Sequence, residues 1–245
     1  MLTATADSLY IGSDTTSLGG EYHARLGSFP QIGGTANPAP RPATLPTDLF
    51  VVHADGVLDR RPFTGVSFGT PIGISGSQID GVDWSDVRGA FMVNGVLYTI
   101  HDDGTMKTWT WDGVRFVNPL DLAPWFSLAN KTLLAYANGR IFYTTAGDAT
   151  LYWRWFSIES GLLGSERFVA DPGTGGANWH NAVGLTVAGG KMYTAHSTGN
   201  LTRTDLYIDG MPVPGTTVIV SGPAVGDGLD WNVVDLFVFS GGGAK

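Results

Sequence analysis

Short apolar segments, separated by turn residues, run along the whole chain. The clearest group lies between residues 88 and 118, where four segments rich in Val, Phe, Tyr, Thr and Trp are separated by Asn94-Gly95, Asp103-Gly104 and Asp112-Gly113. Asn-Gly and Asp-Gly pairs favour the backbone twist of two-residue hairpins, and Val, Thr and aromatic residues favour strands. The pattern therefore predicts a meander of four antiparallel strands, which we call A to D in chain order.

One motif recurs through the chain: an aliphatic residue, an aromatic residue, and a short run that ends in a polar residue. The aromatic positions 10, 50, 98, 142 and 193 are 40, 48, 44 and 51 residues apart. This spacing is typical of a β-propeller, in which each four-stranded sheet forms one blade of a ring. The motif occurs as Leu9-Tyr-Ile-Gly-Ser13, Leu49-Phe-Val-Val-His53, Leu97-Tyr-Thr-Ile-His101, Ile141-Phe-Tyr-Thr-Thr145 and Met192-Tyr-Thr-Ala-His196.

The two ends of the chain predict how the ring closes. Residues 1–46 contain a B-like and a C-like strand without an A strand, and residues 234–239 contain an A strand without the others. We therefore expect an all-β, five-bladed β-propeller of four-stranded antiparallel blades, with the ring closed by the C-terminal strand pairing into the first blade. An irregular six-bladed ring and a repeat that does not close are the alternatives.

The second expected blade, residues 44–76, is the least regular. Its inner strand would come from the Pro-rich residues 37–46, where proline removes backbone donors. We expect residues 1–245 to form a single domain, with residues 240–245 as a flexible tail.

Three runs carry a resemblance to known proteins. Ser8-Leu-Tyr-Ile-Gly-Ser-Asp14, Asp83-Trp-Ser-Asp-Val-Arg-Gly-Ala-Phe91 and Phe156-Ser-Ile-Glu-Ser-Gly161 resemble segments of propeller modules in large secreted proteins of actinobacteria and in some of their phages. The blade number and size resemble tachylectin-type five-bladed lectins, and five-bladed glycosidases share the architecture. The resemblance implies an extracellular or virion-surface location within a larger assembly, but no particular activity, because fold alone does not define function.

Tryptophans recur just before the predicted A strands, and histidines recur at the ends of B strands. Because blade strands alternate in direction, the D-to-A connections and the B-to-C turns lie on the same face of the ring. We therefore expect one face to carry both sets of side chains together with Asp and Asn residues. The candidate ligand-binding residues are Trp84, Asp86, Trp125, Trp179, Asn181, Trp231, Asn232, His101 and His196.

Two interpretations of the tryptophans stay open. An indole offers a flat apolar surface to a sugar ring, and Asp or Asn supplies hydrogen bonds to its hydroxyls. Equivalent large aromatics also serve as packing wedges between blades. The histidines stand too far apart around a ring to share one metal ion, so we predict hydrogen-bonded histidines at turns and no metal site.

Composition excludes several classes of protein. The chain has 14 Lys and Arg against 22 Asp and Glu, for a formal net charge of −8, and no basic run that would neutralise a nucleic-acid backbone. It has no cysteine for a disulfide or thiolate metal site. No apolar run is long enough to predict membrane insertion, and the N-terminus lacks a signal-peptide pattern. No sequence motif indicates a cofactor.

The sequence thus predicts a non-enzymatic binding module, carbohydrate-binding (lectin-like) or adhesive, whose partner is a glycan or a protein. A glycoside hydrolase is one alternative, since some five-bladed propellers use paired carboxylates for that reaction. Only three glutamates are present, and Glu166 is the plausible acid among them, with Glu159 in a turn. A purely structural protein-docking domain is the other alternative.

Overall fold

The structure is a computed structural model that describes residues 42–122, 128–158, 161–173 and 177–240, together with strands within residues 1–30. Those strands pair as a three-stranded sheet (β1-β2-β5) and a hairpin (β3-β4). Trp125 and Glu159 lie outside the described residues. The early strands are β1 (Leu2–Ala4), β2 (Ser8–Gly12), β3 (Ser17–Leu18), β4 (Glu21–Tyr22) and β5 (Leu26–Pro30).

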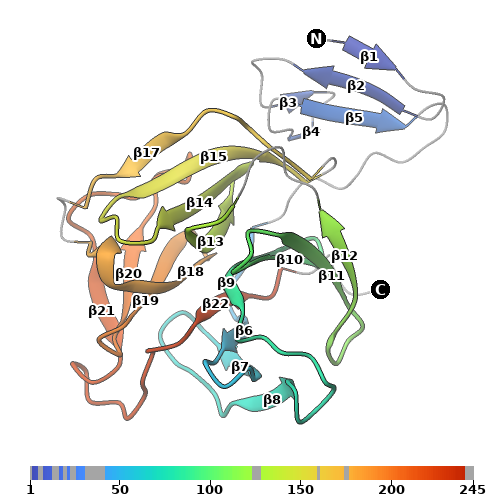
Figure 1. Cartoon of the computed structure of the whole chain (residues 1–245). Coiled ribbons are helices and arrows are strands. Elements are labelled where there is room, and N and C mark those ends of the chain that lie inside the picture. Colours follow the sequence, from blue (N-terminus) through green and yellow to red (C-terminus); the bar gives the residue numbers. More distant parts are fainter. Residues whose placement is uncertain are drawn as a thin grey trace.

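Four antiparallel sheets form the blades of a propeller (Figure 1). Blade 1 consists of β22 (Asp235–Val238), β6 (Thr47–Val52), β7 (Leu58–Phe63) and β8 (Ile72–Ser75). Blade 2 consists of β9 (Val87–Val93), β10 (Val96–His101), β11 (Met106–Trp111) and β12 (Phe116–Leu122). Blade 3 consists of β13 (Lys131–Ala137), β14 (Arg140–Thr145), β15 (Leu151–Ser157) and β17 (Phe168–Asp171), with β16 (Leu162–Leu163) paired to β15. Blade 4 consists of β18 (Ala182–Ala188), β19 (Lys191–His196), β20 (Leu201–Asp205) and β21 (Val218–Ser221), preceded by the 3₁₀ turn η1 (Trp179–Asn181).

The predicted hairpin turns join the inner strand of a blade to the next strand outward. Asn94 and Gly95 have φ angles of 51° and 81°, and Asn138 and Gly139 have φ angles of 50° and 73°. Successive positive φ angles are those of the type I′ turn, which Asn-Gly adopts at little cost. The A-to-D meander predicted from these turns is confirmed in blades 2, 3 and 4.

The predicted blade count is wrong, because the ring has four blades. The C-terminal strand β22 pairs with β6, with Leu236 opposite Val51 and Phe237 opposite Phe50. Its partner β6 belongs to the expected second blade, so β22 is that blade's inner strand; of the residues 37–46 expected there, 42–46 precede β6 and 37–41 lie outside the described residues. Strands β2 and β5, assigned to the first blade, do pair with each other, but the other neighbour of β2 is β1 and not the C-terminal strand β22. The inner strands β22, β9, β13 and β18 contact one another in cyclic order and complete the ring.

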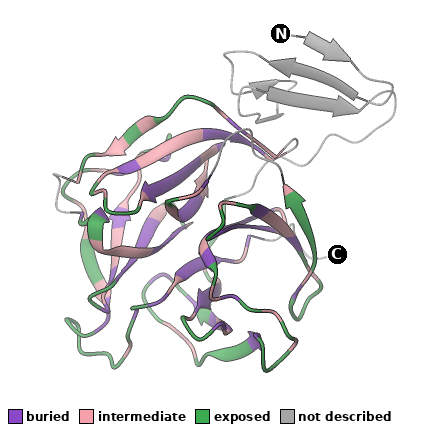
Figure 2. Ribbon diagram, in the orientation of Figure 1, coloured by how far each residue is buried: buried purple, intermediate pink, exposed green. Residues whose placement is uncertain are grey.

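The core is divided among the four junctions between neighbouring blades (Figure 2). The aromatic residues of the recurring motif, Phe50, Tyr98, Phe142 and Tyr193, are all buried in these junctions. The end of the ring is packed as well: Ser240, expected in a flexible tail, is buried, and its carbonyl accepts a hydrogen bond from Gly95 N (2.8 Å). The described residues contain no helix with the length and apolar character needed to cross a bilayer.

Candidate functional site

The D-to-A connections and the B-to-C turns meet on one face of the ring, as predicted. Trp84 N donates to Gly56 O in blade 1 (3.5 Å), and Trp231 N donates to Gly199 O in blade 4 (3.0 Å). Each connection therefore folds back onto the B-to-C turn of the blade it leaves. The two loops share a sequence pattern, Asp-Gly-Val-Asp-Trp-Ser at residues 80–85 and Asp-Gly-Leu-Asp-Trp-Asn at residues 227–232. This face positions the candidate site.

A central funnel of about 540 Å³ opens on this face and is lined by all four blades. Its volume lies within the range of small-molecule sites. The walls combine hydroxyl, charged and imidazole side chains with apolar ones. The polar lining residues are Ser85, Arg88, Thr132, Thr144, Thr145, Asp148 and His180; the remaining lining residues are Ala54, Leu133, Ala146, Gly147, Trp179, Ala182, Val183, Val233 and Val234.

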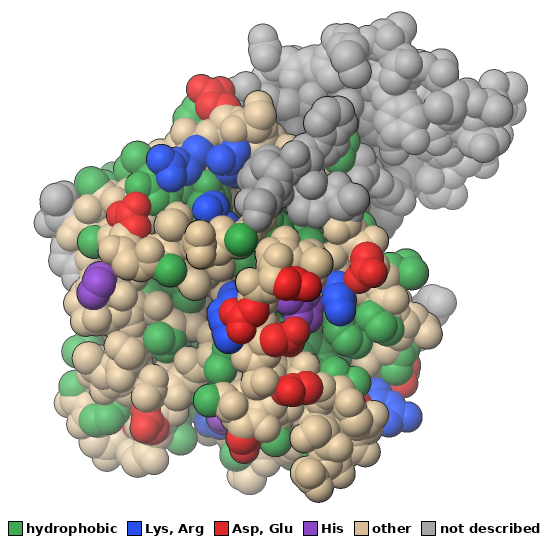
Figure 3. Space-filling model, in the orientation of Figure 1, with side chains coloured by type: hydrophobic (Ala, Val, Ile, Leu, Met, Phe, Trp, Pro, Cys, Tyr) green, Lys and Arg blue, Asp and Glu red, His purple; other side chains and the backbone are tan. Residues whose placement is uncertain are grey.

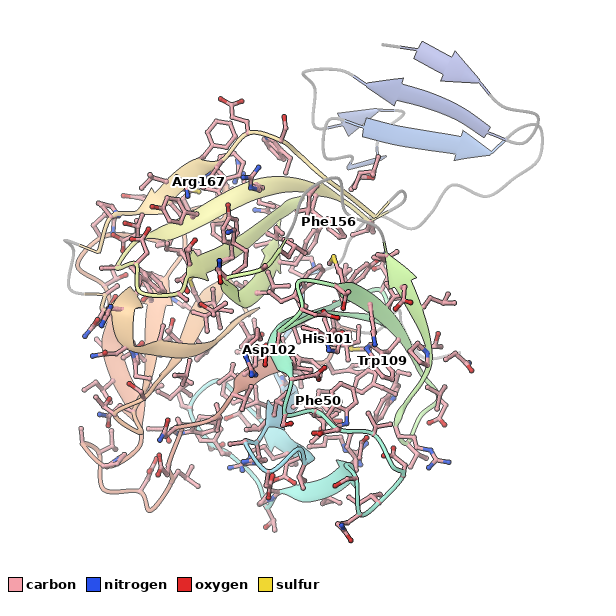
Figure 4. The ribbon with its side chains drawn as sticks, in the orientation of Figure 1. Phe50, His101, Asp102, Trp109, Phe156 and Arg167 are labelled. Carbon is pink, nitrogen blue, oxygen red and sulfur yellow. The ribbon has the colours of Figure 1, made fainter. Side chains whose placement is uncertain are left out.

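Arg88 brings a fixed positive charge to the funnel. Its Nη1 donates to the carbonyl oxygens of Ser85 (2.7 Å) and Val87 (2.8 Å), and its Nη2 forms an ion pair with Asp102. Both charged side chains are partly exposed. Figure 3 shows acidic, basic and histidine side chains gathered near the middle of this view, in the region where Figure 4 labels His101 and Asp102. The blade 2 side of the funnel is therefore polar and charged.

The chain buries an unusual carboxyl group next to the funnel lining. Asp235 follows the lining residue Val234 and is fully buried. The amides of Leu236, Leu185 and Ala90, from three inner strands, face the carboxyl and act to lower its pKa, but burial has the larger effect and holds that pKa well above its usual range. Among the described residues, no donor completes a well-formed hydrogen bond to either oxygen.

The three candidate tryptophans that the structure describes are packing wedges. Trp84, Trp179 and Trp231 are 0%, 2% and 1% exposed and lie in three different blade junctions. The indoles of Trp84 and Trp231 are therefore closed to a ligand, and Trp179 lines the funnel but exposes only 2% of its surface, so none of the three offers the flat sugar platform that was expected. An exposed platform cannot also fill the space between two blades.

A hydroxyl relay explains how two of these polar indoles are buried. Trp84 Nε1 donates to Ser75 Oγ (2.7 Å), which donates to Asp80 (3.0 Å). Trp231 Nε1 donates to Ser221 Oγ (2.6 Å), and that hydroxyl donates to Asp227 (2.6 Å). Burying an indole without a partner for its N–H would be costly, so the relay fixes the wedge in one orientation. Trp179 is built differently, because its Nε1 has no partner among the described residues.

The two candidate histidines are buried turn residues, 5% and 7% exposed. His101 Nδ1 lies 3.1 Å from Asp86 Oδ2, and its Nε2 lies 2.9 Å from Thr99 Oγ1, which also accepts a hydrogen bond from Trp109 Nε1 (3.0 Å). Figure 4 shows His101 and Trp109 side by side in blade 2. The network ties the start of β9 to β10 and β11, so His101 and Asp86 hold blade 2 together.

His196 and Asn181 meet at a second, smaller pocket on blade 4. His196 Nε2 lies 2.9 Å from Thr202 Oγ1, and burial lowers the pKa of the imidazole. The pocket measures about 230 Å³ and is lined almost entirely by amides and hydroxyls. The lining residues are Asn178, Asn181, His196, Thr198, Asn200, Thr202, Thr217 and Ile219. Asn232, the last candidate, is exposed and belongs to neither this pocket nor the funnel.

Apart from Trp179, the funnel residues were missed by the sequence analysis because they do not repeat between blades. His180 was detectable, since it follows Trp179 directly, and Asp235 was detectable as a lone acid within the apolar run Val233-Val-Asp-Leu-Phe237. Thr132 and Thr144 carry no such signal; their hydroxyls lie 2.7 Å apart across β13 and β14. Within the described ranges, no group of three or more His, Asp or Glu side chains is arranged to hold a metal ion.

Comparison with known proteins gives no family. No family model matches the chain, and no curated protein matches it. Solved structures with some similarity include the nidogen/laminin complex (15% identity, TM-score 0.38), in which the match covers 76% of this chain and 64% of the other. The chain thus spans less than two thirds of that protein.

Two further matches are similarly weak. Myxococcus xanthus glutaminyl cyclase is 14% identical with a TM-score of 0.39, over 69% of this chain and 75% of the other. PorZ, a surface component of the type-IX secretion system of Porphyromonas gingivalis, is 12% identical with a TM-score of 0.37, over 90% of this chain and 28% of the other. None of these proteins lends its activity or partner to this chain, and none bears on the resemblance to actinobacterial, phage or tachylectin-type modules. The propeller assignment rests on the chain's own strand pairing.

Proposed function

We propose that this chain is a non-enzymatic binding module whose central funnel holds a hydroxylated ligand, such as the end of a glycan. The observation that carries the proposal is the lining of the 540 Å³ funnel, where four hydroxyl side chains stand among apolar ones. A sugar presents hydroxyls around its edge and C–H groups on its faces, which suits such a mixed wall. The polar pocket on blade 4, at about 230 Å³, suits a second, smaller contact with the same class of ligand.

A binding role is favoured over hydrolysis by the carboxylates available. Among the described lining residues of the funnel, Asp148 is the single carboxylate. It accepts hydrogen bonds from Tyr152 Oη (2.7 Å) and Thr150 N (3.0 Å), and the hydrogen bond from Tyr152 is the main reason that its pKa is lowered. Glycoside hydrolysis needs a second carboxyl across the bond, and one of the pair with a raised pKa. Glu166, the candidate acid, is exposed and does not line the funnel.

The experiment is a glycan array followed by calorimetric titration with variants that block the funnel. Ala54 is exposed at the rim, so Ala54→Trp narrows the mouth without entering the core. Val114, exposed in the C-to-D turn of blade 2 and outside the lining of both the funnel and the blade 4 pocket, gives the control Val114→Trp. We expect Ala54→Trp to weaken binding at least tenfold and the control to leave it unchanged.

Two results would refute this proposal. One is an array without binding to any glycan class, after which the protein-docking alternative becomes the leading one. The other is a titration in which both Trp variants bind as well as the wild type, since the ligand would then lie elsewhere. The predicted extracellular or virion-surface setting, within a larger assembly, is part of the same proposal, because terminal glycans are displayed there.

A further inference from the structure

A group of basic side chains lies on blade 3 beside the funnel. Lys131 begins β13, next to the funnel residue Thr132; Arg154 lies in β15, and Arg167 directly precedes β17. Figure 3 shows Lys and Arg side chains gathered over β15 and β17, where Figure 4 labels Arg167. We call Lys131, Arg154 and Arg167 the basic cluster. Its position is unexpected in a chain of net charge −8.

Strand register brings Lys131 and Arg154 to the same face of the blade 3 sheet. Lys131 pairs with Thr145, and Tyr143 pairs with Tyr152. Residues two apart in a strand share a face. Lys131, Tyr143 and Arg154 therefore lie on one side of the sheet, with the two tyrosines between the two cations.

The third cation completes the cluster. Trp153 pairs with Phe168, so the same register continued by one residue places Arg167 opposite Arg154. The guanidinium carbon of Arg167 lies 4.2 Å from the ring centroid of Tyr152, within cation–π distance. Two arginines thus face each other across neighbouring strands, where like charges are destabilising.

Hydrogen bonds fix the Arg154 side chain, and the charges of the cluster oppose one another. Arg154 Nε donates to Tyr143 Oη (2.9 Å), and its Nη1 donates to Gly164 O (3.0 Å) and Ser165 O. The pKa of Lys131 is lowered, first by burial and then by the positive charges of Arg154 and Arg167. Within the described part of the chain, no carboxylate is within ion-pair distance of Lys131 or Arg167. The Asp148 carboxylate, whose pKa the charge of Arg167 helps to lower, offsets part of this repulsion, and a bound anion would relieve more of it.

We propose that Lys131 and Arg167, supported by the charge of Arg154, bind a tetrahedral oxyanion of the sulfate or phosphate class. A guanidinium offers paired donors to such a group, and an ammonium adds a compact positive charge. Asp148, held by Tyr152, stands between the cluster and the funnel. The site is therefore a separate contact for an acidic group at the blade 3 side of the funnel, and it does not require a ligand in the funnel itself.

The test uses four probes on the full chain: inorganic sulfate, inorganic phosphate, a sulfated disaccharide, and its unsulfated counterpart. Calorimetric titration at low and high salt measures each affinity. The variants are Lys131→Gln and Arg167→Gln, and the control is Lys191→Gln, which removes a lysine already paired with Asp205 (2.7 Å). Loss of a charge-assisted hydrogen bond is expected to weaken oxyanion binding at least tenfold in each cluster variant and to leave the control unchanged.

Binding of the sulfated disaccharide but not of the inorganic ions supports a site for sulfated sugars. Binding of the inorganic ions as well supports a site for free oxyanions too. A wild type that binds no oxyanion, or equal weakening in Lys191→Gln, overturns the proposal. Melting temperature without ligand separates binding from a structural role: Lys131→Gln should melt no lower than the wild type, because the substitution removes like-charge repulsion. A clear drop in that melting temperature would also overturn it. Ala54→Trp should leave sulfate binding intact, so a failure of the funnel proposal can be told apart from a failure of the oxyanion proposal.

Discussion

Replacing Asp235 with Asn is expected to change the dependence of stability on pH. The Asp235 carboxyl is fully buried, and its pKa in the folded protein is well above the ordinary value because burial disfavours the charge. Between the unfolded pKa, about 3.9, and the raised folded pKa, the folded state holds a proton that the unfolded state has lost. Stability from this group is therefore fully present below about pH 4 and falls as the pH rises.

The size of the effect follows from linkage. One proton of difference changes the free energy of unfolding by about 1.4 kcal/mol per pH unit between the two pKa values. Asn has nearly the same shape but does not titrate. Relative to the wild type, Asp235→Asn should therefore gain about 1.4 kcal/mol of stability per pH unit above pH 4, and the difference should level off at the folded pKa.

Urea unfolding from pH 4 to pH 8 at constant ionic strength measures the difference between the two proteins, which cancels the titration of the other acids. Asp227→Asn is the matched control with the opposite sign. A hydrogen bond from Ser221 is the main cause of the lowered pKa of Asp227, so that side chain contributes stability that is lost on acidification. If the wild type and Asp235→Asn show parallel pH profiles, the carboxyl is ionised in the folded ring and the reasoning about burial is refuted.

Three further predictions concern packing and buried polar groups. In Gly184→Ala the new Cβ would lie 3.0 Å from a backbone nitrogen of the neighbouring inner strand, so urea unfolding should show a loss of about 1–3 kcal/mol, whereas Gly73→Ala, with contacts of 3.5 Å or more, should be nearly neutral. Ser221→Ala removes the acceptor of the Trp231 indole N–H and should cost about 1–3 kcal/mol by the same measurement, and an unchanged midpoint would contradict the relay. Burial lowers the pKa of His196, so protonation favours the unfolded state and stability should fall as pH drops below about 6.5; His196→Gln should reduce that loss in denaturation measured at pH 5 and pH 7.5.

Local structure was largely predictable from the sequence. The Asn94-Gly95 and Asn138-Gly139 turns and the spacing of the aromatic motif identify the blades, because turn type and alternation act over a few residues. The same locality explains the wrong blade count. Leu9-Tyr-Ile-Gly-Ser13 has the pattern of a second blade strand, but no pattern states which strand pairs with which, and β22 pairs with β6.

The candidate site was predictable only in outline. The shared face of connections and turns follows from strand direction and is confirmed by the hydrogen bonds of Trp84 and Trp231. Whether an indole faces solvent or a neighbouring blade depends on the volume between two sheets, which the sequence does not display. Thr132 and Arg88 reach the funnel because the inner strands bring four distant segments around one axis. A residue that lines the funnel in one blade, with no equivalent in the others, cannot be found from the sequence repeat.

The pairing of β22 with β6 also has a consequence for how the protein is made. Blade 1 receives its inner strand, Asp235–Val238, only after the other three blades have been synthesised. Until then, one edge of β6 carries unpaired backbone groups, and the nascent chain exposes a sheet edge that can pair with another chain. Ring closure is therefore a late event during translation. A chain released before residue 235 is made would lack the inner strand of blade 1 and would form an open ring that is prone to aggregation.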